Sequence, residues 1–263
     1  MATDSGASFT APSRSPISAP VSTSPPRPAQ EETGAFAQAT PVVRFDHVSS
    51  SRGPEDRLRS LSFALAPGSF HMLTGPSGSG KTSMLRLICV ADRPSQGVAQ
   101  VFGRDVATLS RKDAALVRRR IGSVLYPLLF VDHLSVWDNA ALVPRVIGRD
   151  PADYGPEVDA VLKWMGLARS ADAAPATLAP DERHRLAMAR AVVNRPEILL
   201  LDEPSQGLEA AFRERALKLA GEIHGAGATV VMVSRDEAFA AQAGHPILRL
   251  QDGRASIVEP GGQ

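Results

Sequence analysis

The sequence predicts an α/β fold in which helices cover both faces of a largely parallel sheet. Two runs of apolar residues predict buried strands, ILLLD at 198–202 and TVVMVS at 229–234. Long helical patterns separate these runs, as expected when crossover helices join parallel strands. A third observation is the glycine-rich stretch GPSGSGKT at 75–82, which follows an apolar strand pattern and opens a helical one. Hydrophobic residues make up 43% of the chain, which is enough for a packed core.

Alternating or continuous apolar residues predict the strands, and helical periodicity predicts the elements between them. The predicted strands cover residues 42–48, 58–65, 69–75, 98–102, 198–202, 229–234, 246–253 and 255–259. The predicted helices cover residues 81–91, about 208–224 and 237–244. Residues 110–194 are mainly helical in pattern, with breaks at 126–130, 148–151 and 174–177.

The composition divides the chain into three parts. Residues 1–40 are rich in Ser, Pro and Ala and cannot bury enough apolar surface to offset the entropy of ordering, so we expect a disordered tail. Residues 41–255 are expected to form one domain, with a helical insert at roughly 110–190. Residues 256–263 are expected to be a flexible C-terminus.

Charge and cysteine content limit the functions to be considered. The chain has 29 basic and 28 acidic residues, so its net charge gives no reason to expect nucleic acid as a partner. Its one cysteine, Cys89, cannot form an internal disulfide, which favours a reducing, cytoplasmic location. No apolar run approaches the roughly 20 residues that cross a bilayer. A membrane location would therefore depend on a partner.

The stretch GPSGSGKT matches the phosphate-loop pattern G-x-x-x-x-G-K-[ST] in the required position between a strand and a helix. Glycines let several backbone N–H groups point inward, and the helix N-terminus adds positive potential. Lys81 would contact the β- and γ-phosphates, and the Thr82 hydroxyl would ligate Mg²⁺. The predicted nucleotide-binding residues of this loop are Gly75, Pro76, Ser77, Gly78, Ser79, Gly80, Lys81, Thr82 and Ser83.

A second motif, ILLLDEP, ends an apolar strand with two adjacent carboxylates. Open α/β sheets bind ligands at the carboxyl ends of their strands. Asp202 is therefore predicted to contribute to the Mg²⁺ and nucleotide site. Glu203 is predicted to orient or deprotonate the attacking water.

In the order and spacing of these motifs the chain resembles the ABC transporter-type ATPase family. Within it, the chain is most similar to bacterial cell-division ATP-binding proteins of the FtsE type. The stretches that support this are VRFDHVS, LTGPSGSGKTSMLRLI, LVRRRIG, VWDNA and ARAVVNRPEILLLDEPSQGLE.

The resemblance implies a P-loop NTPase fold with a RecA-like core, an N-terminal antiparallel β section and a helical insert. It also implies ATP and Mg²⁺ as cofactors and a homodimer or heterodimer of ATPase subunits that sandwich ATP. The implied partner is an integral-membrane, permease-like protein of the FtsX type. That partner would place the chain on the inner face of the plasma membrane.

Three departures from the family pattern bear on catalysis or on contact with a second subunit. Tyr126 stands where the family has its Q-loop glutamine, and Arg235 stands where it has its switch histidine. Arg235 could add charge stabilisation at the γ-phosphate and act catalytically beside Glu203. It could equally form an ion pair with Glu203 and quench the base. The sequence leaves both alternatives open.

The third departure is APD at 179–181, where the family has a Ser-Gly-Gly loop that reaches the phosphate held by a second subunit. Ala179 removes a hydroxyl, Pro180 removes an N–H donor and Asp181 adds a negative charge beside an anion. The same residues suit a helix start, since Pro at the first position and acids in the first turn complement the helix dipole. We therefore expect a capped helix without phosphate contact.

Three hypotheses on function remain. The first is a slow or partner-dependent ATPase that uses Glu203 and Arg235. The second is a catalytically degenerate ATP-binding scaffold that regulates a membrane partner. The third is the ATPase subunit of an ABC exporter of the lipoprotein-release or macrolide type.

Overall fold

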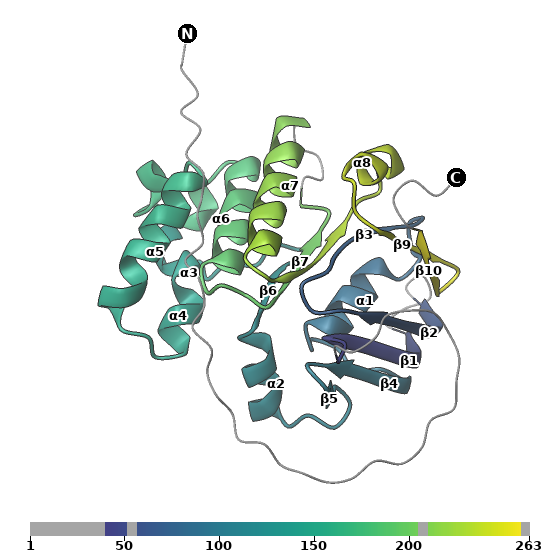
Figure 1. The fold of residues 1–263 in the computed structure, drawn as a ribbon. Helices are drawn as coiled ribbons and strands as arrows, with labels where there is room; N and C mark the ends of the chain where they lie inside the picture. The colour runs from purple at the N-terminus through teal and green to yellow at the C-terminus, as the bar shows by residue number, and fades with distance from the viewer. Residues whose placement is uncertain (1–39, 52–56, 205–209, 259–263) are drawn as a thin grey trace.

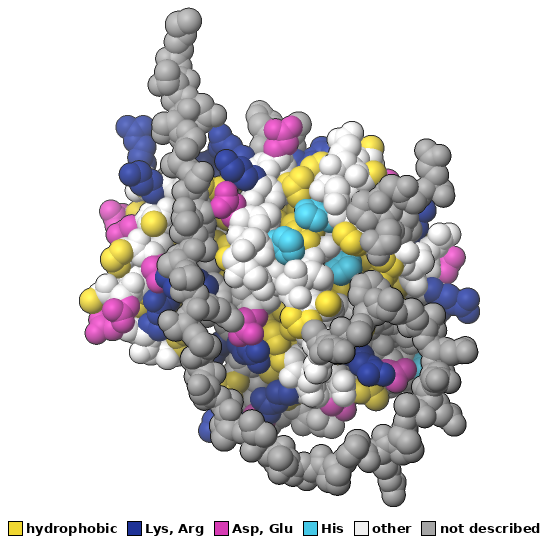
Figure 2. All heavy atoms as spheres, viewed as in Figure 1, with side chains coloured by type: hydrophobic (Ala, Val, Ile, Leu, Met, Phe, Trp, Pro, Cys, Tyr) yellow, Lys and Arg dark blue, Asp and Glu magenta, His cyan; other side chains and the backbone are white. Residues whose placement is uncertain are grey.

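The computed structural model describes residues 40–51, 57–204 and 210–258, which form two sheets and the helices around them (Figure 1). Residues 1–39 of the predicted tail lie outside the described residues, as do residues 259–263 at the C-terminus. Figure 2 shows the same face, on which histidine and apolar side chains gather near α7 and α8.

The smaller sheet is antiparallel, with strand order β2-β1-β4-β5. Its strands are β1 (Val43–Ser51), β2 (Arg57–Leu65), β4 (Gln96–Val101) and β5 (Arg104–Asp105). It confirms the predicted N-terminal antiparallel β section. In Figure 1 this sheet lies beside helix α1 (Lys81–Ile88), away from helices α5 (Pro151–Trp164) and α6 (Pro180–Val192).

The larger sheet has strand order β10-β9-β3-β8-β7-β6. Its strands are β3 (Phe70–Thr74), β6 (Ile121–Val124), β7 (Ile198–Asp202), β8 (Thr229–Val233), β9 (Ile247–Gln251) and β10 (Arg254–Val258). All neighbours pair in parallel except β10, which runs antiparallel to β9. Asp202 is opposite Val233 in the register of β7 and β8. The ends of β3, β7 and β8 therefore bring the phosphate loop, Asp202 and Arg235 to one edge.

Successive residues of the central strands pack into two separate cores. In β7, Leu199 and Leu201 belong to the core beneath the helical insert, whereas Ile198 and Leu200 face the smaller sheet and α1. This arrangement explains why the strand is a continuous apolar run rather than an alternating one. The predicted α/β fold with a sheet covered on both faces is confirmed.

The helices outside α1 lie mainly in the insert and on the C-terminal half of the core. Hydroxyl or carboxylate side chains cap several of them, with Ser110, Ser135 and Asp150 accepting backbone N–H bonds. The helices are α2 (Arg111–Arg118), α3 (Val136–Ala140), α4 (Leu142–Val146), α5 (Pro151–Trp164), α6 (Pro180–Val192), α7 (Ala210–Gly225) and α8 (Glu237–Gln242). Among the described residues, no helix is long and apolar enough to span a bilayer.

Two boundaries of the predicted domain plan need comment. Strand β6 (Ile121–Val124) lies within residues 110–190, which were predicted as the helical insert, because four residues carry too little periodicity to be recognised before their partner β7 is known. The boundary drawn at residue 256 falls inside the strand predicted over residues 255–259. Strand β10 (Arg254–Val258) agrees with that predicted strand, and its backbone pairs with β9 as far as Ile247.

Candidate nucleotide site

The phosphate loop joins β3 to α1, and its backbone requires glycine at two points. Gly75 has φ 142°, and a Cβ there would lie 2.0 Å from the Leu250 carbonyl oxygen. Gly80 has φ 99°, and its Cβ would lie 2.6 Å from Leu58 Cδ2. The loop thus fits closely between the two sheets, in a conformation that L side chains rarely adopt.

The loop holds the Lys81 ammonium with its own carbonyl groups. Lys81 Nζ donates to the carbonyl oxygens of Gly75 at 2.8 Å and Pro76 at 2.7 Å. Lys81 and Ser79 are each 6% exposed, whereas Pro76, Ser77 and Gly78 are exposed. A buried, positively charged group therefore lies behind an exposed glycine-rich surface, which is the arrangement that binds phosphate oxygens.

The two residues predicted to hold Mg²⁺ lie together although 120 positions separate them in sequence. Thr82 Oγ1 donates a hydrogen bond of 2.7 Å to Asp202 Oδ2. Thr82 lies in the first turn of α1, and Asp202 ends β7. A hydroxyl and a carboxylate oxygen are hard ligands of the kind that Mg²⁺ prefers, so this donor set fits that cation.

Glu203 follows Asp202 with φ 45° and forms an ion pair with Arg235, in which Nε and Oε1 are 2.5 Å apart. Burial raises the pKa of Glu203, and the neighbouring Arg235 guanidinium partly offsets this rise. The Glu203 side chain is 13% exposed and that of Arg235 is 56% exposed. Of the two alternatives for Arg235, the structure contains the ion pair.

The turn after β8 places Arg235. The Asp236 amide donates to Ser234 Oγ at 3.1 Å, and Asp236 caps α8 by accepting from the Phe239 amide at 2.9 Å. Asp236 also forms an ion pair with Arg213 of α7 at 2.5 Å. Arg235 thus lies between two residues whose backbone positions are fixed, and its guanidinium reaches Glu203.

Tyr126 follows β6 and is 66% exposed. The segment after it is attached to the insert by side chains that sequence reasoning did not single out. Arg190 Nη1 of α6 donates to the Leu129 carbonyl at 2.7 Å, and fully buried Asn139 accepts from the Val131 amide at 2.9 Å. Asn139 lies within VWDNA, one of the stretches that resemble the family, and this was the only feature of the sequence that could have pointed to it. Leu129 itself is 71% exposed.

Helix α6 begins at Pro180, with Ala179 as the preceding, extended residue. Asp181 Oδ2 is 2.6 Å from Arg185 Nη2, and Glu182 accepts a hydrogen bond of 3.0 Å from the Ala179 amide. Asp181 and Glu182 are therefore occupied within their own helix. This matches the predicted capped helix start.

Taken together, the fold and the phosphate loop define a nucleotide-binding α/β domain of the P-loop class. The chain matches the model of the ABC transporter family over residues 58–206. The chain belongs to this family, as an ABC-type ATPase. The predicted resemblance to the FtsE type is also confirmed by its similarity to curated relatives.

Two relatives are cell division ATP-binding proteins FtsE. The protein of Escherichia coli (strain K12) is 35% identical over 213 residues, which cover 81% of this chain and 96% of the relative. The protein of Bacillus subtilis (strain 168) is 31% identical over 196 residues, covering 74% of this chain and 86% of the relative. Among solved structures, the dimeric ATP-binding cassette MJ0796 bound to ADP and Pi is 27% identical. Its TM-score to this chain is 0.76, and the match covers 84% of this chain and 100% of the solved chain.

Proposed function

We propose that the chain is the ATP-binding subunit of a membrane-associated, FtsE-like complex in cell division, and that it binds Mg·ATP and hydrolyses it slowly. Its nucleotide-binding domain would span residues 41–258. The observation that carries the binding part is the Thr82–Asp202 hydrogen bond beside the glycine-rich loop. The cell-division role rests on the similarity to FtsE proteins.

In this proposal the loop Gly75–Ser83 binds the phosphates through backbone N–H groups and the Lys81 ammonium. Thr82 and Asp202 would hold Mg²⁺, whose charge would neutralise phosphate oxygens. Glu203 would accept the proton of the attacking water. To do so it must be ionised and released from Arg235.

Slow hydrolysis is proposed because of the way Glu203 is held. Its burial favours the protonated carboxyl, and the ion pair with Arg235 occupies its ionised form. While the ion pair holds, the carboxylate is less available as a base. Tyr126 adds to this, since it cannot reproduce the amide contacts of a glutamine.

Dimerisation with a second ATPase subunit is also expected to be weak where residues 179–181 (Ala-Pro-Asp) would face that subunit's phosphate. Each lost hydrogen bond to a charged group costs about 1.5–3 kcal/mol. The ion pair of Asp181 with Arg185 reduces the repulsion of a phosphate, but it leaves the segment without the lost donors. An FtsX-type membrane protein would therefore supply part of the assembly energy and hold the chain at the inner face of the plasma membrane.

The proposal is tested by phosphate release from the full chain, alone and with its co-encoded membrane protein in vesicles. The matched control is Lys81→Ala, which removes the buried ammonium of the loop. We expect slow release that increases with the partner and is absent in the control. Release at the control level in both settings would contradict the enzymatic part.

A second candidate is an ATP-binding scaffold that regulates its membrane partner with little turnover. The Glu203–Arg235 ion pair favours it, because this pair occupies the base. ATP binding that changes the partner's state without phosphate release would support the scaffold. Equally tight ATP binding by the Lys81→Ala variant would contradict both candidates.

A further inference from the structure

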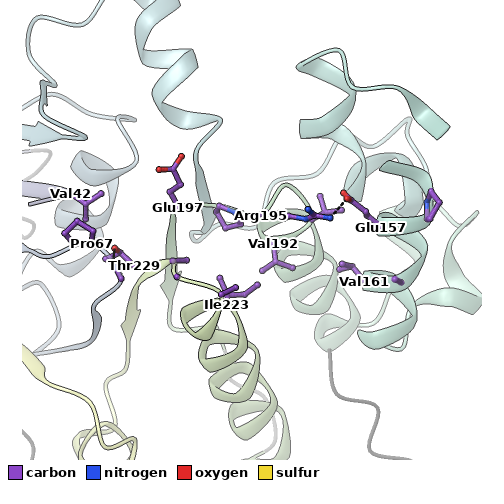
Figure 3. Close-up of a pocket in the computed structure, with 17 residues that line it drawn as sticks. Val42, Pro67, Glu157, Val161, Val192, Arg195, Glu197, Ile223 and Thr229 are labelled. Carbon is purple, nitrogen blue, oxygen red and sulfur yellow. Dashed lines mark hydrogen bonds and ion pairs between the residues drawn. The ribbon is translucent and has the colours of Figure 1, made fainter. Parts of the chain in front are cut away.

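A cavity of about 560 Å³ lies at the edge of the larger sheet where β7 and β8 begin. The phosphate loop and Asp202 lie at the opposite edge, where the strands end. Val42, Pro67 and Thr229 lie at one end of the cavity and Glu157 and Val161 at the other (Figure 3). Helices α5, α6 and α7 contribute apolar side chains, which are Val161, Val192 and Ile223.

The charged side chains of the lining are already engaged in ion pairs. Glu157 pairs with Arg149 at 2.9 Å and also with Arg195. Glu197 accepts two hydrogen bonds of 2.8 Å from Arg120. An ionic ligand would have to compete with these partners. The lining therefore favours an apolar occupant over a charged metabolite.

The start of the described chain lies at the rim of this cavity. Val42 is part of the lining, and its backbone is fixed by two hydrogen bonds. The Val42 amide donates to the Leu65 carbonyl at 2.9 Å, and the Val42 carbonyl accepts from the Phe102 amide at 2.8 Å. Residues 1–39, which lie outside the described part, are thus tethered beside the cavity at high effective concentration.

We propose that residues 34–38 of this chain occupy the cavity, with Phe36 as the anchoring side chain. Phe36 is the large apolar residue of the tail nearest to Val42 and lies in the sequence GAFAQ. Five residues lie between Phe36 and Val42, so the extended chain lets the two Cα atoms be up to about 20 Å apart. The small residues Ala35 and Ala37 on either side let the backbone approach the walls.

This occupant would contact the helical insert and the core at once. Val161 and Val192 belong to α5 and α6 of the insert, whereas Ile223 and Thr229 belong to α7 and β8 of the core. The docked segment therefore ties the insert to the core on the side away from the nucleotide. This function of the tail is independent of the proposed cell-division role.

Hydrogen–deuterium exchange of the full chain tests the proposal, using wild type, Phe36→Asp, the matched control Phe9→Asp and Ala160→Arg. The last variant narrows the cavity from an exposed position on α5. In wild type and Phe9→Asp we expect amides 35–39 to exchange at least about tenfold more slowly than in Phe36→Asp, because burial of one phenylalanine shifts an equilibrium by at least that factor. Segments 192–197 and 223–229 should show the same contrast.

Ala160→Arg leaves the tail unchanged but should cause the same loss of protection of residues 35–39 as Phe36→Asp. If Ala160→Arg does not fold, Ala226→Arg, at another residue of the cavity lining, takes its place. Equal exchange of these amides in wild type and Phe36→Asp would overturn the proposal. Protection that grows with protein concentration would identify the tail of a second copy as the occupant, which also overturns it. So would a loss of protection in Phe9→Asp.

Discussion

At Glu203, burial and a neighbouring guanidinium shift the pKa in opposite directions. Burial is the larger effect, so the pKa lies above its ordinary value. Removing Arg235 would raise it further, because the favourable charge is lost. It would also free the carboxylate from its ion pair. In a pH–rate profile, the change in pKa shifts the acid limb, whereas the release of the carboxylate changes the plateau rate.

We therefore expect Arg235→Gln to move the acid limb of phosphate release to higher pH, since a base with a higher pKa ionises later. The plateau rate should rise by about tenfold, a fraction of the 10²–10⁴-fold that a positioned general base contributes. The control is Arg249→Gln, which breaks an exposed pair with Glu237. A profile that does not differ from wild type would show that the ion pair does not limit Glu203.

His245 makes stability depend on pH. Its ring stacks on Phe70 with centroids 3.8 Å apart, and burial followed by the charge of His224 lowers its pKa. The unfolded chain binds this proton at a higher pH than the folded one. Stability is therefore fully present above the ordinary histidine pKa of about 6.5 and falls as pH decreases towards the folded value.

His245→Phe keeps a stacking ring without a titrating group. We expect the urea midpoint of this variant to fall less than that of wild type between pH 8 and pH 5.5. The exposed His133→Gln serves as control and should behave as wild type. An identical pH dependence in His245→Phe and wild type would assign the effect to groups other than His245.

Among the connecting elements, the segment between β6 and α3 depends on one buried amide. Asn139 accepts from the Val131 amide and donates to the carbonyls of Val131, Leu134 and Ser135 at 2.9–3.2 Å. Asn139→Ala would leave these backbone groups unpaired, at a cost of about 1–3 kcal/mol for each group that stays dry. We expect a lower free energy of unfolding by urea denaturation. Asn194→Ala, which removes one exposed hydrogen bond, should lose much less.

The residues at the start of α6 stabilise the helix but lack the hydrogen-bond donors that a phosphate of a second subunit would need. Replacing Ala179, Pro180 and Asp181 by Ser, Gly and Gly would restore hydrogen-bond donors and remove the repulsive carboxylate. It would also remove the Asp181–Arg185 ion pair, a small loss at this exposure. We expect ATP-dependent dimerisation to tighten by at least about tenfold in sedimentation, with Asp181→Ala giving part of the gain. No gain in the triple variant would mean that this segment does not limit assembly.

On the scale of the molecule, the features of the fold and of the site that the sequence predicts are local in sequence. The strands β7 and β8 are continuous apolar runs, and the phosphate loop is one stretch of eight residues. Strand β6 was missed because its four residues become a strand only by pairing with β7. The choice between two roles for Arg235 could not be made from sequence, because the contact with Glu203 depends on where two strands end.

The two cores on either side of β7 also bear on how this protein evolves. The positions that we propose to depart from the family pattern lie outside both cores. Tyr126 is 66% exposed, and the side chains of Asp181 and Arg235 are 47% and 56% exposed. Substitutions at such positions leave packing intact. Substitutions that change turnover or subunit pairing can therefore arise at these positions without loss of packing, whereas a substitution in β7, the strand that ends at Asp202, disturbs both cores.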